Sequence, residues 1–301
     1  MDTSAFAALG PAELRAVLPG FLAAYVSPEA ADGARNAAAA VVVHMDDAAC
    51  RAVVDLLTRV ATDVRIWDAQ PGARDVARAY IGSLVLTPRV DGLHHVDDAL
   101  AMGPVVLVCN HLSYVDTTVT DYVLAHAGRS DLAARLFAAA GPKVYQDLFR
   151  RVAAICLNTL PVPQSGHLGH AEKLPPRDLV RWVQQSLDAT AERLAVGGSL
   201  VIYPEGARTR TGRMGSFLRG VHRYLAVAPG TRVVPMAISG TERLMPLGVE
   251  RLHHAACRVR FGASLSVEPG GSREALAQAH TAVSDLLPEP LRPAEETPPL
   301  V

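Results

Sequence analysis

The sequence predicts an α/β fold in which strands alternate with helices, preceded by a helical region. Three observations lead to this prediction. Residues 1–85 carry apolar side chains at three- and four-residue spacing, which is typical of amphipathic helices. From Arg89 onward, short apolar runs alternate with longer amphipathic stretches, as in layered α/β proteins. The chain has 301 residues, half of them hydrophobic, which is enough to bury a large core.

We expect three parts: a helical region at 1–85, a main domain at 86–287, and a tail at 288–301. In the first part, the apolar spacing predicts helices over residues 11–26, 46–67 and 72–86. The tail "PEPLRPAEETPPLV" is rich in Pro and Glu, a composition that predicts disorder.

The main domain is expected to begin with a short strand pair and to continue with alternating elements. The long helix near its middle begins at Pro176 and is followed by two glycines, a usual pattern for helix ends. The expected strands are 89–96, 105–109, 134–140, 153–162, 199–203, 232–238 and 257–262, and the expected helices are 114–127, 145–152, 176–196 and 272–287.

Charge and cysteine content exclude several classes of protein. The formal net charge of −1 gives no global field that would favour nucleic acid. The four cysteines are scattered without a C-x-x-C pair, which argues against a zinc site and fits a reducing compartment. No secretory signal pattern and no apolar run of about 20 residues are present. We therefore expect a cytoplasmic protein, with peripheral contact to the inner face of a membrane left open.

The stretch "NHLSYVD", residues 110–116, contains the first candidate for catalysis. His111 directly follows the apolar strand 105–109, and ligand sites of α/β sheets often lie at such strand ends. Asp116 would lie in the first turn of the next helix, where it can bind one imidazole nitrogen. The other nitrogen could then take a proton from a substrate hydroxyl. By itself, this spacing fits a structural histidine equally well.

The stretch "YPEGART", residues 203–209, contains the second group of candidates. Gly206 permits a tight turn and the close approach of a ligand. Arg208 and Arg210 can direct two guanidinium groups at one anion, and Arg suits phosphate in particular. A solvated basic loop is the alternative interpretation.

Taken together and in this order, the two stretches resemble the phospholipid/glycerol acyltransferase superfamily. Its blocks "NH-x-x-x-x-D" and "(F/Y)PEG-x-R(S/T)" match here, and "VVPMAISGTERLMP" resembles a further apolar block with a proline. The resemblance extends from Arg89 to Val267. It implies the glycerolipid acyltransferase fold, a mixed central sheet flanked by helices.

The resemblance also implies a reaction. An acyl group would move from acyl-coenzyme A or acyl carrier protein to a hydroxyl of a glycerolipid precursor, in phospholipid biosynthesis. His111 would act as general base, Asp116 would orient it, and Glu205, Gly206 and Arg208 would shape the acceptor site. No cofactor beyond the acyl donor and no metal are implied.

The acceptor is less well defined by the resemblance. "AGPKVYQDLF" is similar to soluble, plant-type glycerol-3-phosphate acyltransferases, which implies His167, Arg208 and Arg210 as phosphate ligands. Gly166 and Asn158 stand where basic residues are usual. "VVPMAISGTERLMP" instead resembles bacterial lysophosphatidate enzymes. The long stretch between His111 and Arg208, the helical N-terminal region and the lack of a membrane span are closer to the glycerol-3-phosphate type, so glycerol 3-phosphate is slightly favoured over 1-acylglycerol 3-phosphate. A specialised alcohol, or a non-catalytic protein that binds lipid or acyl carrier, are further alternatives.

Three other groups of residues have simpler interpretations. "RMGSFLRGVHRYL", residues 213–225, mixes arginines with apolar residues and could face a membrane or a carrier protein. The start of an amphipathic helix is the simpler interpretation. The pairs His94-His95 and His253-His254 would point apart on a strand, which disfavours metal binding. Cys109, on a buried strand, is expected to be an inert core thiol.

Overall fold

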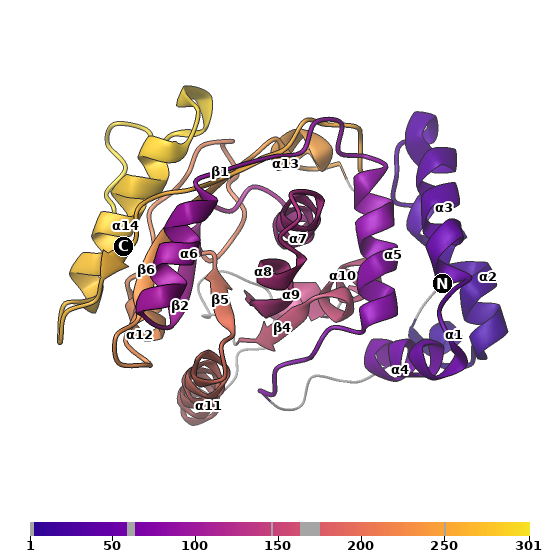
Figure 1. The fold of residues 1–301 in the computed structure, drawn as a ribbon, viewed down its shortest axis with the longest axis horizontal. Helices are drawn as coiled ribbons and strands as arrows, with labels where there is room; N and C mark the ends of the chain where they lie inside the picture. The colour runs from indigo at the N-terminus through magenta and orange to yellow at the C-terminus, as the bar shows by residue number, and fades with distance from the viewer. Residues whose placement is uncertain (1–2, 59–63, 146, 163–174, 250) are drawn as a thin grey trace.

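The computed structural model describes residues 3–58, 64–145, 147–162, 175–249 and 251–301. A mixed sheet of eight strands lies among helices, and helices α1–α5 form a separate group on one side of the molecule (Figure 1). This arrangement confirms the α/β fold with a mixed central sheet and a helical N-terminal region.

Proline begins several helices of the N-terminal region, where its fixed φ suits the first helical position. The prediction missed α3, because this helix buries a face made mostly of alanines, with Ala30, Ala34 and Ala38 at four-residue spacing. The helix predicted at 46–67 ends at Thr58, and part of that stretch lies outside the described residues. The helices are α1 (Thr3–Ala7), α2 (Pro11–Ala23), α3 (Pro28–Val42), α4 (Asp47–Thr58) and α5 (Pro71–Gly82).

The sheet has the strand order β1-β7-β6-β2-β5-β3-β4, and β8 pairs with β6. The five strands β6, β2, β5, β3 and β4 are parallel to one another, whereas β7 and β8 are antiparallel to β6. Strands β2 and β5 are fully buried, as expected for central parallel strands. The strands are β1 (Arg89–Asp91), β2 (Val105–Cys109), β3 (Leu136–Ala140), β4 (Asn158–Pro161), β5 (Ser199–Ile202), β6 (Arg232–Ser239), β7 (Arg258–Phe261) and β8 (Leu265–Ser266).

The helices of the main domain cover different parts of this sheet. α6 and α14 pack on β2 and β6, α11 packs on β4 and β5, and α7 packs on α5 and on β1 and β7. These helices are α6 (Leu93–Met102), α7 (Asp116–His126), α8 (Ser130–Arg135), α9 (Pro142–Tyr145), α10 (Leu148–Cys156), α11 (Pro176–Ala195), α12 (His222–Leu225), α13 (Thr241–Leu244) and α14 (Ser272–Leu286), with short 3₁₀ turns at Arg219–Val221 (η1) and Glu289–Leu291 (η2).

Two strand predictions were wrong in part. The pair predicted at 89–96 is one strand followed by helix α6, because Gly92 turns the chain with φ of 73°. A Cβ at Gly92 would lie 2.1 Å from the carbonyl oxygen of Phe261, so this turn requires glycine. His94 and His95 therefore lie on a helix. Residues 153–156 continue α10, so β4 is shorter than predicted.

Residues 288–301 differ from the disorder expected of them. Leu291 is buried, and Leu300 packs against the core. The backbone carbonyls of Leu291 and Pro299 accept hydrogen bonds from the backbone N–H groups of Met214 and Phe217, at 2.8 and 3.0 Å. The two leucines outweigh the polar composition of the segment because each meets an apolar surface of the domain.

The junction between the N-terminal helices and the main domain is mainly apolar and contains a buried ionic cluster. Helix α5 packs between α3 on one side and α7 and α10 on the other (Figure 1). Asp121 of α7 is buried and accepts from Arg78 of α5 at 2.7 and 3.2 Å, and Arg74 Nε lies 3.4 Å away. This cluster holds α5 on α7 at the centre of the junction.

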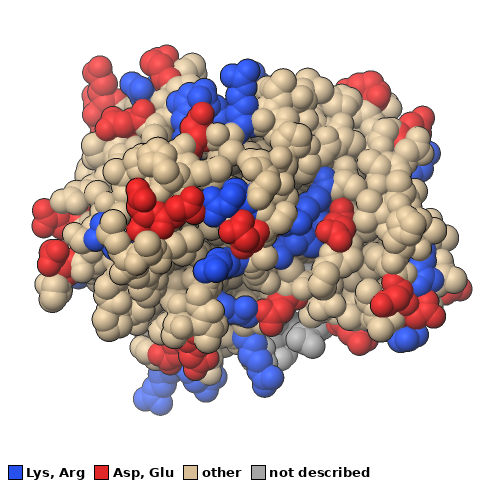
Figure 2. Space-filling view, viewed as in Figure 1, with Lys and Arg blue, Asp and Glu red and all other residues tan. Residues whose placement is uncertain are grey.

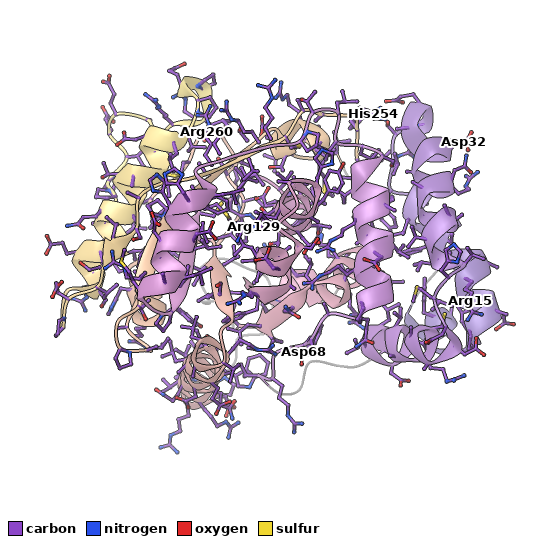
Figure 3. All side chains as sticks on the ribbon, in the orientation of Figure 1. Arg15, Asp32, Asp68, Arg129, His254 and Arg260 are labelled. Carbon is purple, nitrogen blue, oxygen red and sulfur yellow. The ribbon has the colours of Figure 1, made fainter. Side chains whose placement is uncertain are left out.

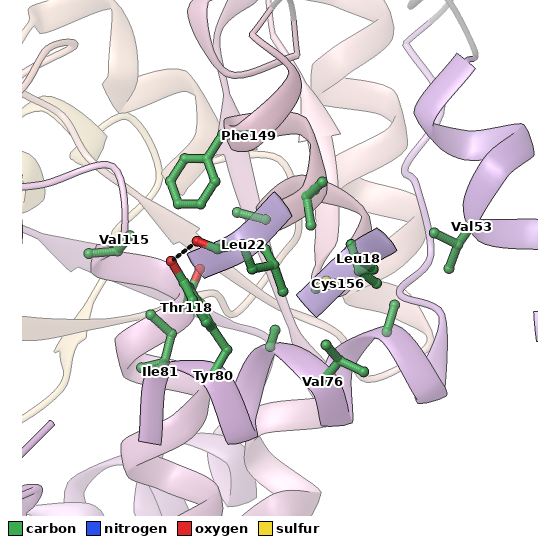
Figure 4. Close-up of a pocket in the computed structure, with 14 residues that line it drawn as sticks. Leu18, Leu22, Val53, Val76, Tyr80, Ile81, Val115, Thr118, Phe149 and Cys156 are labelled. Carbon is green, nitrogen blue, oxygen red and sulfur yellow. Dashed lines mark hydrogen bonds between the residues drawn. The ribbon is translucent and has the colours of Figure 1, made fainter. Parts of the chain in front are cut away.

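The same junction contains a small apolar cavity, which we call the junction cavity (Figure 4). Its volume is about 30 Å³, roughly that of a methyl group. The Tyr80 hydroxyl, beside the cavity, donates to the Leu22 carbonyl oxygen at 3.0 Å. The cavity is lined by Leu18, Leu22, Val53, Ala73, Val76, Ala77, Tyr80, Ile81, Val115, Thr118, Phe149, Val152, Ala153 and Cys156.

Charged side chains on the face shown in Figure 2 alternate in sign. Arg129, near the centre of the view in Figure 3, donates to Asp97 at 2.8 and 3.0 Å and to Asp131 at 3.1 Å. Asp68 pairs with Arg193, and Asp91 pairs with Arg258. Among the described residues, no helix is both long enough and apolar enough to cross a bilayer.

Candidate active site

The two sequence blocks meet because they follow neighbouring parallel strands in matched register. β2 and β5 pair with Val108 opposite Ile202, and His111 and Glu205 each follow three residues later, in the loops beyond the ends of these strands. The backbone N–H of His111 donates to Glu205 Oε1 at 2.8 Å. The His111 carbonyl oxygen accepts from the backbone N–H of Thr209 at 2.9 Å. The carboxyl edge of the sheet therefore joins the two blocks.

His111 and Asp116 form a hydrogen-bonded pair. His111 Nδ1 lies 2.8 Å from Asp116 Oδ2, and the same oxygen accepts from the backbone N–H groups of Leu112 at 2.8 Å and Ser113 at 3.0 Å. Asp116 is only 1% exposed. Since the carboxylate accepts, we assign the proton of a neutral imidazole to Nδ1, which leaves Nε2 as the basic nitrogen.

Asn110 anchors the loop that carries this pair. Its side-chain amide donates to the Ile238 carbonyl oxygen at 3.1 Å and accepts from the Ile238 N–H at 2.9 Å. The side chain thus continues the pairing between β2 and β6 after β2 has ended. Asn110 is fully buried, so any shorter side chain would leave both groups of Ile238 without their partner.

Tyr203 supports the imidazole from one side. Its ring stacks on that of His111, with centroids 4.5 Å apart and an angle of 28° between the planes. The Tyr203 hydroxyl lies 2.8 Å from Thr117 Oγ1. Burial raises the pKa of Tyr203 well above its ordinary value, so the phenol is neutral at physiological pH. Tyr203 and Asp116 together fix the plane and the direction of the histidine ring.

Cys109 lies beside the pair but is fully buried. Burial is the main cause that raises the pKa of its thiol far above the ordinary value, and the nearby Asp116 and Glu205 act in the same direction. A neutral, buried thiol is a poor nucleophile, which agrees with the predicted core thiol.

Glu205 lies behind the site rather than in its wall. Its Oε1 accepts from the His111 N–H, and its Oε2 accepts from the backbone N–H of Gly215 at 2.8 Å. Burial raises the pKa of Glu205 to about 7, although both backbone donors act in the opposite direction. Glu205 therefore links the histidine loop to the segment Met214–Arg219, which we call the return segment.

A cleft of about 540 Å³ opens in front of His111. Four basic side chains line it, namely Lys143, Arg208, Arg219 and Arg223, and none of the described residues that line it is acidic. Most other walls are apolar, including Ala138, Ala139, Ala140, Val144, Leu157, Val162, Val183, Ile202, Leu218, Val221 and Val301. An apolar cleft with only positive charges suits an amphiphilic anion.

Arg208 is held in the cleft by an aromatic ring. Its Cζ lies 3.7 Å from the ring centroid of Tyr114, and Cζ of Arg150 lies 3.8 Å from the same centroid. Two guanidinium groups this close to one centroid must lie on opposite faces of the ring. Tyr114 is thus sandwiched between two arginines, which favours a defined direction for Arg208.

The remaining sequence candidates lie in different places. Gly206 lines the cleft and adopts a φ of 70°, as expected of a tight turn. Arg210 is exposed and does not line the cleft. His167 lies outside the described residues. No group of three or more potential metal ligands occurs among the residues that the structure describes.

Sequence reasoning missed part of the cleft. Arg219 and Arg223 lie in the short elements η1 and α12, so the expected helix begins only at Arg219, and both residues also line the cleft. The signal in the sequence that could have identified these two arginines as cleft residues is their alternation with apolar residues. Tyr114 lies inside the first block, but nothing in its spacing predicts that it contacts Arg208. Val301 comes from the tail, where disorder was expected.

The family model for acyltransferases matches residues 88–239, which is 152 of 301 residues. Over 166 residues, the chain is 30% identical to a chloroplastic 1-acyl-sn-glycerol-3-phosphate acyltransferase of Arabidopsis thaliana. This alignment covers 52% of the chain and 38% of that protein. A chloroplastic 1-acyl-sn-glycerol-3-phosphate acyltransferase of Brassica napus is 33% identical over 89 residues, covering 29% of the chain and 24% of that protein.

The matched region thus spans less than two fifths of the length of these curated relatives. Among solved structures, the chain is similar to the 1-acyl-sn-glycerophosphate (LPA) acyltransferase PlsC from Thermotoga maritima. The TM-score is 0.46 at 17% identity, and the alignment covers 71% of this chain and 82% of the other.

Proposed function

Because the chain belongs to the acyltransferase family, we propose that it transfers an acyl group from an acyl thioester to the free hydroxyl of 1-acylglycerol 3-phosphate. The observation that carries this proposal is the His111–Asp116 pair, 2.8 Å apart, beside a cleft whose described walls are mostly apolar and whose described charged side chains are all basic. Acyl chains fit the apolar walls, and a phosphate fits the basic side chains.

The proposed step uses His111 as general base. Nε2 takes the proton of the acceptor hydroxyl while the hydroxyl oxygen attacks the thioester carbonyl carbon. The tetrahedral intermediate then collapses, the carbon–sulfur bond breaks, and the proton moves from His111 to the departing thiolate. Asp116 stabilises the imidazolium that exists between these two proton transfers. No residue of the protein becomes acylated, because the acceptor supplies the nucleophile.

The acceptor phosphate is proposed to bind Arg208. Arg208 lines the cleft three residues after Glu205, which is itself bonded to His111, so an acceptor held by its phosphate would present its hydroxyl near the base. The stack on Tyr114 restricts the guanidinium before substrate binds, which lowers the entropy cost of binding.

The relatives named above act, by their names, on 1-acyl-sn-glycerol 3-phosphate, which supports this acceptor over the glycerol 3-phosphate that the sequence slightly favoured. Glycerol 3-phosphate is the second candidate, because "AGPKVYQDLF" places Lys143 in the cleft wall together with Arg208. Acyl-coenzyme A or acyl carrier protein as donor, and a cytoplasmic location with contact to a membrane surface, belong to the same proposal.

Thiol release from palmitoyl-coenzyme A tests the proposal, with 1-acylglycerol 3-phosphate and glycerol 3-phosphate measured side by side. We expect release that depends on the lysolipid and that falls by about 10²–10⁴-fold in His111→Ala. The matched control is His44→Ala, which removes an exposed histidine far from the cleft in sequence. Release that requires glycerol 3-phosphate would establish the second candidate. Turnover unchanged in His111→Ala would refute the general base and return a binding role to consideration.

A further inference from the structure

The segment Leu291–Val301, which we call the tail segment, lies along the return segment. The Phe217 N–H donates to the Pro299 carbonyl oxygen at 3.0 Å, and the Val301 N–H donates to the Phe217 carbonyl oxygen at 2.9 Å. The Arg219 N–H then donates to the backbone oxygen of Val301 at 2.7 Å. These alternating bonds form a short parallel bridge centred on Phe217 and Leu300. The tail segment thus extends the return segment sideways, as an added strand does.

Side chains support this backbone pairing. Phe217 is fully buried, and its ring lies edge-to-face with that of His280 on α14, with ring centroids 4.8 Å apart. His280 Nε2 also lies 3.2 Å from the Gly215 carbonyl oxygen. At the other end of the tail segment, the buried Leu291 accepts from the Met214 N–H at 2.8 Å. The tail segment is therefore fixed near both of its ends.

The return segment connects the tail segment to the catalytic pair. On its other side, the Gly215 N–H donates to Glu205, and the Leu218 N–H donates to the Pro204 carbonyl oxygen at 2.8 Å. Glu205 in turn accepts from the His111 N–H. Three hydrogen-bonded contacts in series therefore link the tail segment to the histidine loop: tail segment to return segment, Gly215 to Glu205, and Glu205 to His111.

Val301 is one of the residues at the edge of the cleft. It lines the cleft together with Leu218, Arg219 and Val221, although 55% of its surface is exposed. Its backbone contacts Arg219, whose side chain is one of the four cations of the cleft. The edge of the cleft at this point is thus an apolar patch beside positive charge.

From this arrangement we infer that the tail segment is a wall of the substrate cleft and that Val301 is a specificity-determining residue. The inference rests on the proposed function, because it assigns to Val301 a contact with the amphiphilic anion that enters the cleft. A larger side chain at this position narrows the cleft, and a negative one repels an anion from Arg219 and Arg223.

Two variants of the full chain test the wall directly. Val301→Trp and Val301→Asp should each raise the KM for the lysophospholipid by at least about tenfold, with kcat and the melting temperature nearly unchanged. Ala294→Trp is the matched control, because Ala294 is exposed in the same segment but does not line the cleft. If Val301→Trp and Val301→Asp behave as Ala294→Trp does, the inference is wrong.

A third variant tests whether the tail segment must stay bound to the return segment for normal substrate binding. Leu300→Asp puts a charge where Leu300 packs against the core, so the segment should detach. Amide hydrogen exchange at Phe217 and Arg219 should then accelerate, and the KM should rise as in Val301→Trp. Fast exchange at both amides in the unmodified chain would overturn the inference by itself.

Binding measurements separate this inference from the proposed function. Palmitoyl-coenzyme A should slow exchange at the Val301 amide in the unmodified chain, and should bind more weakly to Val301→Asp than to Ala294→Trp. If no acceptor supports turnover but these binding differences are found, the proposed reaction is wrong, and the assignment of the tail segment as a wall of the cleft stands. If turnover is normal and both Val301 variants match Ala294→Trp in the KM for the lysophospholipid and in the binding of palmitoyl-coenzyme A, the assignment of the tail segment as a cleft wall is wrong and the proposed reaction stands.

Discussion

The cleft and the junction cavity are neighbours, since Thr118 and Ala153 line both, yet they differ in size and chemistry. The cleft has about 540 Å³ and four basic side chains, whereas the junction cavity has about 30 Å³ and no charged side chain among its described lining residues. A void of methyl size is a packing defect. A large space lined by several basic side chains has the character of a ligand site. Changes at the junction should therefore alter stability, and changes in the cleft should alter activity.

The largest expected effect tests the junction. Asp121→Ala leaves the guanidinium groups of Arg78 and Arg74 without their buried partner, so the free energy of unfolding should fall by about 3–5 kcal/mol. The kcat of the folded fraction should not change. Urea denaturation measures the loss, and Asp32→Ala, which breaks an exposed pair with Arg35, should cost less than about 1 kcal/mol. A loss that small in Asp121→Ala as well would show that apolar packing alone holds the junction.

The next largest effect, at Glu205, tests whether the residues that alter stability and the residues that alter activity form separate sets. Glu205→Gln offers one acceptor where the carboxylate offers two, so the N–H of His111 or of Gly215 loses its partner, at a cost of about 1–3 kcal/mol in stability. Because the histidine loop loosens, kcat should fall too. Glu205 is therefore the residue where stability and activity should change together.

The pH dependence of the free energy of unfolding provides the control for Glu205→Gln. Its pKa in the folded protein is raised to about 7, above the ordinary value of 4.5, so the native state holds a proton that the unfolded chain releases. This contribution to stability is complete below pH 4.5 and is lost as the pH rises through 7. Glu205→Gln lacks the titration, so its deficit relative to the unmodified protein should be larger at pH 5 than at pH 8. An equal deficit at both values would contradict the raised pKa.

A smaller effect belongs to the cleft alone. Arg208→Ala should raise the KM for the phosphorylated acceptor by at least about tenfold, a loss of roughly 1.4 kcal/mol, with an unchanged melting temperature. The control is Arg210→Ala, since Arg210 is exposed and does not line the cleft. Steady-state kinetics on both variants decides the assignment. Equal effects would mean that both arginines act only through the general positive field.

The smallest effect is a gain. Val76 is buried and lines the junction cavity (Figure 4), so Val76→Ile adds one carbon to a void of about that size. The free energy of unfolding should rise by up to about 1 kcal/mol, with no change in kcat or KM. Thermal denaturation measures this shift. A loss of stability would show that the walls cannot accommodate the added group.

The fold and the contact between His111 and Asp116 were predictable because they depend on local patterns. Apolar spacing identified most helices and strands, and a histidine after a buried strand with an aspartate five residues later placed the pair correctly. The packing partners were not predictable in the same way. That Glu205 bonds to Gly215, that Tyr114 stacks on Arg208, and that Val301 reaches the cleft all depend on how distant segments meet. Composition misled for the tail because two leucines determine its position.

The register between β2 and β5 has a consequence for how such chains can diverge. The register that sets Val108 opposite Ile202 brings the loops of His111 and Glu205 together. The residues between Asp116 and Ser199 take no part in the pairing of β2 with β5. Insertions or deletions in the intervening helices and loops can change the length between the two blocks while the chemistry keeps its geometry. The cleft walls contributed by Ala138, Lys143 and Val183 lie within this intervening stretch. A change in the intervening segment can thus reshape these walls while the contact between His111 and Glu205 stays in place.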